Sequence, residues 1–221
     1  MKKHLDLVNF LRSICKQSQT NSLLPIIKYY QYRLRWKINL LAHPKAHNQG
    51  LENISTTGLL NVGCGEYYGF TTPSDGTSLN VAGKLIIEGD SVIGRGCRVD
   101  VGRNGRMIVG PDSYVSLFTL FIVMNSLTLG SGSTISWQCM FLDEDFHHLE
   151  YEERKPVGNK GITIGNHVWV GARSTLYQGT VIADGCVVAA NSVVRGIHNQ
   201  PNCLIAGHPA KVIKENVRWY R

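Results

Sequence analysis

The sequence predicts an all-β solenoid, in which short strands wind into stacked coils, and three observations lead to this prediction. An aliphatic residue recurs at every sixth position from Ile164 to Val194, a period that fits neither an α-helix nor an ordinary strand. The residue that follows is mostly small, as a tight corner requires. The same period runs earlier in the chain, with slips of four and two residues that mark small loops. The aliphatic or aromatic positions are Val81, Ile87, Ile93, Val99, Val109, Val115, Phe121, Leu129, Ile135, Phe141, Ile164, Val170, Leu176, Ile182, Val188 and Val194.

Residues 1–50 form a basic amphipathic segment that we expect to be helical. Apolar residues from Leu5 to Ile14 follow helical spacing, and Pro25 indicates a break before the basic, aromatic stretch KYYQYRLRWKI. Two interpretations remain open. The helices either pack on the end of the solenoid or on a neighbouring subunit, or they present a face that binds a membrane surface or a polymer.

Residues 51–200 are assigned to the solenoid, with the first coils in the glycine-rich stretch 51–80. The period fails between Phe141 and Ile164, which lie 23 positions apart, and this is not a multiple of six. A loop over residues 142–161 must therefore leave the solenoid at a corner. Loops of this kind commonly build the binding site of a repeat protein. Residues 201–221 are expected to cap the last coil with a short helix that begins near Pro209.

Charge and cysteine content exclude several classes of protein. Residues 1–50 hold nine Lys and Arg against one acid, Asp6, while the rest of the chain is nearly neutral. The solenoid therefore offers no basic stripe for nucleic acid. Six cysteines without a CxxC pair are typical of free thiols in a reducing compartment, and no secretory signal is apparent, so we expect a cytoplasmic protein.

Neither a membrane span nor a metal centre is predicted. The apolar run Leu117 to Met124 is too short to cross a bilayer and is interrupted by Thr119. Asp143, Asp145, His147 and His148 are all ligand types, but they lie together without a second pair at a known spacing, so no metal is expected.

Three stretches resemble the hexapeptide-repeat acyltransferases, and most closely the branch that O-acetylates sugars. They are ISWQCMFLDEDFHHL, ITIGNHVWVGARSTLYQGTVIADGCVVAANSVVRG and AGHPAKVIKENVRW. The resemblance implies a left-handed parallel β-helix, acetyl-CoA as co-substrate and a homotrimer with active sites between neighbouring solenoids. It also implies that His147, after the DxDFH-like stretch, is the general base, with the adjacent His148 as the alternative.

The chemistry requires a base because a sugar hydroxyl is a weak nucleophile at neutral pH, and imidazole can accept its proton. Asp145 is our candidate to orient His147, with Asp143 and Glu150 as alternatives. Asp143 is also, with Trp137, a candidate contact to the acceptor sugar, although Trp137 and Trp169 could both be packing residues.

The remaining site residues follow from the resemblance alone. Gly171, Ala172 and Ala190 correspond to corners that meet the pantetheine arm, and Lys211 and Lys214 to basic positions that face the phosphates of coenzyme A. One departure from the pattern is notable. This chain reads VSLFTLFIV where maltose and galactoside acetyltransferases carry an asparagine. Ser116 and Thr119 are the candidates to substitute for that asparagine. The difference argues against small free sugars as acceptors.

The sequence thus predicts an acetyl-CoA-dependent O-acetyltransferase of a saccharide in a bacterial surface polysaccharide, either capsule or lipopolysaccharide O-antigen. Contact with the inner face of the membrane through residues 1–45 is one hypothesis for holding the acceptor. The alternatives are an N-acetyltransferase of a nucleotide-linked amino sugar, an antibiotic acetyltransferase, and a scaffold or carbohydrate-binding subunit without activity.

Overall fold

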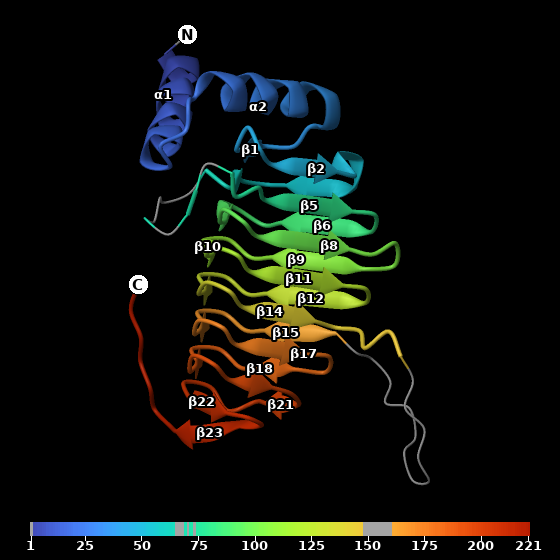
Figure 1. The fold of residues 1–221 in the computed structure, drawn as a ribbon. Coiled ribbons are helices and arrows are strands. Elements are labelled where there is room, and N and C mark those ends of the chain that lie inside the picture. Colours follow the sequence, from blue (N-terminus) through green and yellow to red (C-terminus); the bar gives the residue numbers. More distant parts are fainter. Residues whose placement is uncertain (1, 65–68, 70, 73, 148–160) are drawn as a thin grey trace.

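The computed structural model describes residues 2–64, 69, 71–72, 74–147 and 161–221. Within them the chain winds into a parallel β-helix, whose three sheets form the sides of a tall prism (Figure 1). Each coil contributes in turn one strand to sheet A, one to sheet B and one to sheet C, and strands of neighbouring coils pair in parallel. The predicted β-solenoid is confirmed.

The strands are short and are assigned to the sheets as follows. Sheet A contains β1 (Leu40–Ala42), β4 (Leu60–Val62), β7 (Ser91–Ile93), β10 (Ser113–Val115), β13 (Thr134–Ile135), β16 (Trp169–Val170), β19 (Val187–Val188), β22 (Leu204–Gly207) and β23 (Ala210–Lys214). Sheet B contains β2 (His47–Gln49), β5 (Ser78–Val81), β8 (Arg98–Val101), β11 (Leu120–Val123), β14 (Met140–Leu142), β17 (Thr175–Tyr177) and β20 (Val193–Val194). Sheet C contains β3 (Ile54–Thr56), β6 (Lys84–Ile87), β9 (Arg106–Val109), β12 (Ser126–Leu129), β15 (Ile162–Ile164), β18 (Val181–Ile182) and β21 (Ile197–His198), and a 3-10 turn, Leu51–Asn53, precedes β3.

The six-residue period marks the interior of the prism. Every repeating aliphatic or aromatic position predicted above is at most 1% exposed. These residues stack in register from coil to coil, as in the pairs Phe121↔Phe141 and Phe141↔Leu176. The rings of Phe121 and Phe141 lie 4.7 Å apart and nearly parallel. The core is therefore one continuous apolar column along the axis.

A ladder of small hydrogen-bonding side chains lines the inside of the corner between sheets A and B. The side chain of each member donates a hydrogen bond to a backbone carbonyl of the next coil, at distances from 3.0 to 3.3 Å except for the 2.9 Å bond of Cys97. Burial raises the pKa of Cys97 to about 12 and that of Cys139 to about 11, so both remain neutral thiol donors. The members are Thr77, Cys97, Thr119, Cys139 and Ser174.

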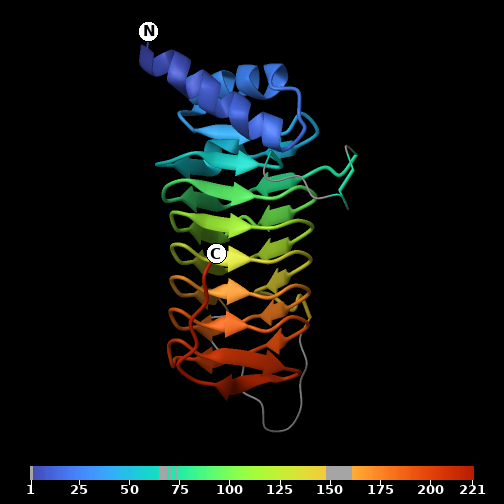
Figure 2. The same ribbon diagram turned by 90° about the vertical axis from the view of Figure 1, so that its left-hand side faces the viewer.

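Two helices, α1 (Lys2–Gln17) and α2 (Leu23–Trp36), cover the N-terminal end of the prism (Figure 2). The chain breaks between them rather than at Pro25, which lies in the first turn of α2, where a missing backbone N–H disrupts no helical bond. Leu41 of β1 packs against the helices together with Leu11 and Tyr29. The first coil begins at Leu40, eleven residues before the start expected from the sequence, residue 51.

The C-terminal helix predicted after Pro209 is wrong. Residues Ala210–Lys214 form β23, which pairs antiparallel with β22 in sheet A. The last coil of a solenoid exposes unpaired backbone N–H and C=O groups along its sheet edges, and pairing with these groups outweighs a weak local helix preference. The β-branched Val212 and Ile213 also suit a strand.

The C-terminal residues then run back along the outer face of sheet A (Figures 1 and 2). The Trp219 ring stacks on His167 at 4.2 Å, and its indole N–H donates a 2.8 Å hydrogen bond to the His167 carbonyl. Arg221 donates to the Asp112 carbonyl at 3.1 Å. Neither described helix has the length and apolar character that a membrane span requires.

Candidate active site

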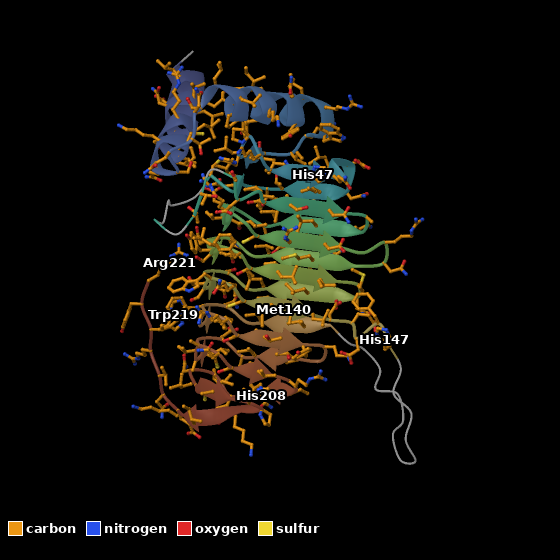
Figure 3. The ribbon with its side chains drawn as sticks, in the orientation of Figure 1. His47, Met140, His147, His208, Trp219 and Arg221 are labelled. Atoms are coloured by element: carbon orange, nitrogen blue, oxygen red, sulfur yellow. The ribbon has the colours of Figure 1, made fainter. Side chains whose placement is uncertain are left out.

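Two edges of the prism carry the residues that the sequence singles out. The A–B edge consists of the turns from each sheet A strand to the following sheet B strand, and the B–C edge of the turns from sheet B to sheet C. The loop predicted at 142–161 leaves from the B–C edge after β14, and its start carries His147 (Figure 3). His148 and Glu150 lie outside the described residues.

His147 is exposed, and one of its ring nitrogens is held by the loop backbone. Its Nδ1 lies 3.3 Å from the carbonyl oxygen of Asp145. A carbonyl oxygen can only accept, so Nδ1 carries the proton in this bond and Nε2 presents its lone pair outward. This is the tautomer that a general base needs, and the backbone rather than a carboxylate orients it.

The Asp145 side chain faces the neighbouring coils. Its carboxylate accepts a hydrogen bond from the side-chain amide of Gln178 and lies 3.9 Å from the Arg195 guanidinium. The same guanidinium lies 4.2 Å from the ring centroid of Tyr177. The three partners therefore anchor the start of the loop to the B–C edge two residues before His147. Asp145 contributes to His147 through its backbone carbonyl and through this anchor.

Asp143 is buried and fixes the start of the loop to the prism through hydrogen bonds. It is 0% exposed, and its two carboxylate oxygens accept hydrogen bonds from the backbone N–H groups of Met124 and Asn125, at 2.7 and 2.9 Å. The Asn125 amide donates in turn to the Asp143 carbonyl at 2.9 Å. Burial raises the pKa of Asp143 above its ordinary value, and these hydrogen bonds partly offset that effect. The predicted contact of Asp143 with the acceptor does not suit this enclosed position.

Replacing Asp143 by alanine should destabilise the folded chain. The backbone N–H groups of Met124 and Asn125 would lose their acceptors, and each buried unsatisfied donor costs about 1–3 kcal/mol. We expect the melting temperature to fall by roughly 5–15 °C, measured by thermal unfolding followed by circular dichroism.

Asp100→Ala is the control, because that carboxylate accepts from the Asn80 side chain and not from the backbone. A raised pKa in the folded state means that the folded protein binds the proton more tightly. The stability of the wild type relative to Asp143→Asn should therefore be greatest in acid and fall as the pH rises above the ordinary Asp range. Equal melting temperatures for Asp143→Ala and Asp100→Ala would contradict the role of Asp143 in fixing the start of the loop.

The residues predicted to bind coenzyme A lie on the A–B edge. Ala172 follows β16 and Ala190 follows β19, one coil apart, and Ala190 is exposed. Gly171 is buried, and a Cβ there would lie 2.5 Å from the backbone nitrogen of Ala190, so close stacking of the two coils also requires this glycine. Trp137, 42% exposed, lies on the same edge one coil before Ala172. Lys211 and Lys214 are exposed on β23 at the end of the prism.

Other predicted residues are engaged in packing. Trp169 lies on the outer face of sheet A, and its indole N–H donates to the Ser136 hydroxyl at 3.0 Å. Ser116 and Thr119 are buried, and Thr119 belongs to the internal ladder. Neither presents a hydroxyl to solvent in place of the asparagine. Among the residues that the structure describes, no group of three or more His, Cys, Asp or Glu is arranged to hold a metal ion.

The predicted base and the predicted cofactor residues lie on different edges of the prism. Ala172 on the A–B edge and Gln178 on the B–C edge are six positions apart, with β17 between them. At about 3.3 Å per residue this corresponds to roughly 15–20 Å, whereas a base must lie within hydrogen-bond reach of its substrate. The described residues of one chain therefore do not bring His147 and Ala172 together.

Gln178, Tyr177 and Arg195 were not anticipated from the sequence. The register pairs Leu176 with Val194, so Tyr177 and Arg195, 18 residues apart, occupy the same corner position in neighbouring coils. One coil contains three six-residue repeats, so a step of 18 residues leads to the same position in the next coil. This count would have placed Tyr177 and Arg195 beside the start of the loop. Asn125 lacks such a signal, because the slip before Leu129 obscures its position at the corner.

Comparisons with known proteins match both the repeats and the chain as a whole. The family model described as bacterial transferase hexapeptide (six repeats) matches residues 161–196. A 24.8 kDa protein in the cps region of Klebsiella pneumoniae is 34% identical over 224 residues, which is 98% of this chain and 97% of that protein. The proposed lipopolysaccharide biosynthesis O-acetyl transferase WbbJ of Escherichia coli K12 is 30% identical over 132 residues, which is 55% of this chain and 67% of that protein.

Solved structures share the fold at low sequence identity. The polysialic acid O-acetyltransferase OatWY superposes with a TM-score of 0.51 at 18% identity, covering 82% of this chain and 87% of that one. A mutant of AntD, an N-acyltransferase from Bacillus cereus in complex with dTDP and coenzyme A, gives 0.52 at 17% identity and covers 82% of each chain.

Proposed function

We propose that this chain, which belongs to the bacterial hexapeptide transferase family, O-acetylates a saccharide of a surface polysaccharide with acetyl-CoA as donor. The observation that carries the proposal is the exposed imidazole of His147, whose Nδ1 is held by the Asp145 carbonyl. The relative from a cps region and the relative named for lipopolysaccharide biosynthesis support the acceptor class, capsule or O-antigen.

The proposed reaction is direct transfer in a ternary complex. Nε2 of His147 accepts the proton of the sugar hydroxyl while its oxygen attacks the thioester carbonyl carbon. The resulting tetrahedral oxyanion collapses, the carbon–sulfur bond breaks, and the imidazolium returns the proton to the departing thiolate of coenzyme A. Asp145, Gln178 and Arg195 hold the loop so that the imidazole keeps its position.

Each active site would form between two copies of the chain in a trimer of left-handed β-helices. The A–B edge of one copy would bind the pantetheine arm at Gly171, Ala172 and Ala190, where small side chains permit close approach. Lys211 and Lys214 on β23 would face the phosphates, as exposed cations near the same end of the prism. The B–C edge of the neighbouring copy would supply His147.

Radiolabelled acetyl-CoA tests the reaction with a panel of surface polysaccharides, UDP-amino sugars and antibiotics as acceptors. Transfer of an alkali-labile acetyl group to a polysaccharide is the expected result. An alkali-stable product on an amino sugar would instead establish N-acetylation, and transfer to an antibiotic would establish drug inactivation. Coenzyme A binding without transfer to any acceptor would favour a subunit without activity.

Helix α2 presents an apolar stripe that faces away from the prism. Leu23, Ile27 and Leu34 lie on one helical face and are 68%, 45% and 84% exposed. The opposite face, with Tyr29 and Pro25, is buried. Basic residues flank the stripe, namely Lys28, Arg33, Arg35 and Lys37. An apolar stripe with cationic borders matches a helix that lies in the surface of an anionic membrane, which would hold the enzyme on the cytoplasmic face, where its six free thiols stay reduced.

The triple variant Leu23→Asn, Ile27→Asn, Leu34→Asn should therefore lose membrane affinity. Binding to vesicles of phosphatidylethanolamine and phosphatidylglycerol, measured by co-sedimentation, should weaken more than about tenfold, because burying one such side chain is favourable by about 1.5–3 kcal/mol.

Ile197→Asn is the control, since Ile197 is 71% exposed on sheet C, far from α2. Unchanged vesicle binding of the triple variant would contradict membrane contact. A smaller particle in analytical ultracentrifugation, with vesicle binding intact, would show that the stripe contacts a neighbouring subunit.

A further inference from the structure

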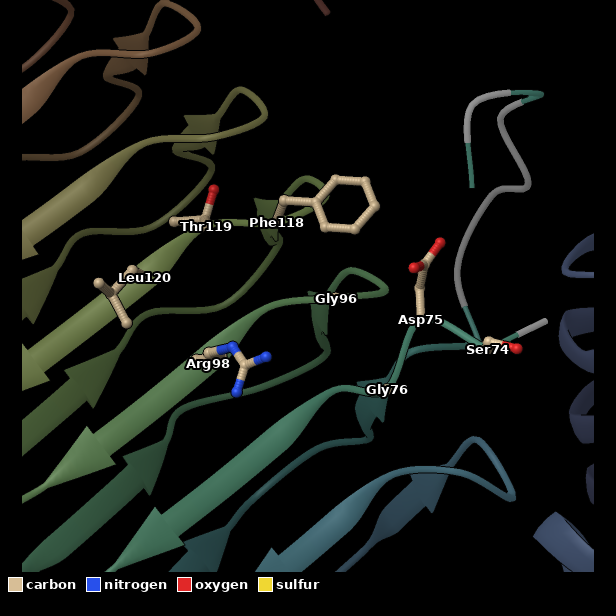
Figure 4. Close-up of a pocket in the computed structure, with 8 residues that line it drawn as sticks. All are labelled: Ser74, Asp75, Gly76, Gly96, Arg98, Phe118, Thr119 and Leu120. Carbon is tan, nitrogen blue, oxygen red and sulfur yellow. The ribbon is translucent and has the colours of Figure 1, made fainter. Parts of the chain in front are cut away.

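A cavity of about 440 Å³ opens on the A–B edge near the N-terminal end of the prism. Residues from three successive coils line it, and Phe118 and Arg98 come from adjacent coils with Asp75 across from them (Figure 4). Gly76 and Gly96 contribute backbone to its wall. The mechanism proposed above uses none of these residues.

The ring of Phe118 forms a fixed aromatic wall. Phe118 has a positive φ of 57° at its corner, and its ring lies where a side chain on Gly96 would otherwise be. Gly96 itself has φ of +73°, which favours glycine. Two unusual backbone conformations in adjacent coils thus set the ring against the backbone at the mouth of the cavity, and an aromatic face packs well on the C–H face of a sugar ring.

Two charged groups complete the cavity. Arg98 is exposed at the start of β8, and its guanidinium makes no hydrogen bond or ion pair with the residues that the structure describes. The guanidinium is thus available for a carboxylate, which it can bind through two parallel hydrogen bonds. Asp75 is half-buried, and one carboxylate oxygen accepts a hydrogen bond from the Thr72 backbone at 2.6 Å. Its other oxygen can accept a hydrogen bond from a hydroxyl.

We propose that this cavity binds an acidic sugar unit of the acceptor, with its ring on Phe118, its carboxylate on Arg98 and a hydroxyl on Asp75. This inference rests on the proposed function, because it names the class of acceptor for the same reaction. An aromatic wall, a free guanidinium and a carboxylate acceptor together match a sugar that carries both a negative charge and hydroxyl groups. They do not match a neutral or an amino sugar equally well, since either would leave Arg98 unpaired.

The position of the cavity along the edge agrees with this assignment. Phe118 lies one coil before Trp137, and Gly96 and Arg98 lie two coils before it. Coils are spaced by about 4.8 Å, so Arg98 lies roughly 10 Å from the level of Trp137. Ala172 and Ala190 lie one and two coils beyond Trp137 on the same edge. The acceptor and the pantetheine arm would thus approach the coil of Trp137 from opposite ends of one edge, and the loop with His147 leaves the prism from that same coil.

Binding of matched oligosaccharides to the full-length protein tests the proposal by isothermal titration calorimetry. The probes are a glucuronate-containing tetrasaccharide and a sialic acid dimer, each compared with its carboxyl-reduced form. We expect the wild type to bind at least one acidic form about tenfold or more tightly than its reduced form. Arg98→Gln should abolish this preference, and Phe118→Leu should weaken both forms alike, by roughly three- to tenfold.

Arg106→Gln is the matched control, because Arg106 is likewise exposed at the start of a strand but lies in sheet C outside the cavity. It should keep the preference. Equal binding of the acidic and reduced forms by the wild type, or a preference that survives in Arg98→Gln, would overturn the proposal.

Hydrolysis of acetyl-CoA without acceptor separates this inference from the proposed function. Absence of both hydrolysis and transfer in the wild type would reject the enzymatic function alone. Transfer to a polysaccharide with no preference for acidic sugars would reject only the cavity assignment.

Discussion

Replacing His147 by alanine should lower the rate of acetyl transfer by about 10²- to 10⁴-fold, the usual contribution of a positioned general base. In the proposed mechanism the imidazole accepts the hydroxyl proton. The other described ionisable side chains at the start of the loop, the carboxylates of Asp143, Glu144 and Asp145, are all engaged in hydrogen bonds or an ion pair. The KM for acetyl-CoA should change little, since the predicted cofactor residues lie on the other edge. Steady-state kinetics with saturating acceptor measure both quantities.

His47→Ala is the control for this prediction. His47 is likewise an exposed histidine, but it lies in strand β2 at the far end of the prism, where its Nε2 is 2.7 Å from the side-chain amide nitrogen of Gln49. Its removal should leave transfer unchanged. Full activity of His147→Ala would remove this residue from the mechanism and make His148 the next histidine to replace. Partial recovery of His147→Ala by added imidazole would identify the lost group as a proton acceptor.

Mixing two inactive variants should restore activity, because the two halves of each proposed site come from different chains. His147→Ala lacks the base on the B–C edge, and Ala190→Trp places a bulky side chain on the exposed A–B corner where pantetheine would pass. In trimers assembled at random from equal amounts, about one site in four has both edges intact. The mixture should therefore regain about a quarter of the wild-type rate after unfolding and reassembly together.

The double variant, with both substitutions on one chain, provides the control for the mixture. When mixed with wild type at equal amounts, it also leaves about a quarter of the sites intact, so the two mixtures should have equal rates. If each chain instead contained a complete site, the mixture of single variants would stay inactive and the mixture with wild type would keep half its activity. That outcome would exclude the shared site.

The six-residue period predicted the interior of the prism because every side of a coil buries an aliphatic or aromatic residue in the core. The longer strands bury a second one two positions earlier, as Leu85 before Ile87. It failed at the first coil for a physical reason. Leu40 and Ala42 face the common core, whereas Leu41 faces outward into the packing against α1 and α2. Three consecutive apolar residues therefore conceal the repeat wherever a helix covers the outer side of a strand.

The candidate site was only partly predictable. The position of His147 in the loop followed from the failure of the period and from the resemblance of the stretch around it. The partners of Asp143 and Asp145 did not, because hydrogen bonds to Met124 and Asn125, and contacts with Gln178 and Arg195, join residues 18 to 50 positions apart. The C-terminal strand was missed because its partner is the exposed edge of β22, which only the assembled coils create.

The ladder of Thr77, Cys97, Thr119, Cys139 and Ser174 bears on how a protein of this fold could come to acetylate a different sugar unit of its acceptor. Each rung donates a hydrogen bond to the coil that follows it. A complete coil could therefore be inserted or removed between Phe118 and Trp137 without altering the contacts within the remaining coils. Such a change would shift the cavity relative to the loop by about 4.8 Å along the axis. The number of coils between the cavity and the loop would then determine how far along the polymer the acetylated sugar lies from the sugar bound in the cavity.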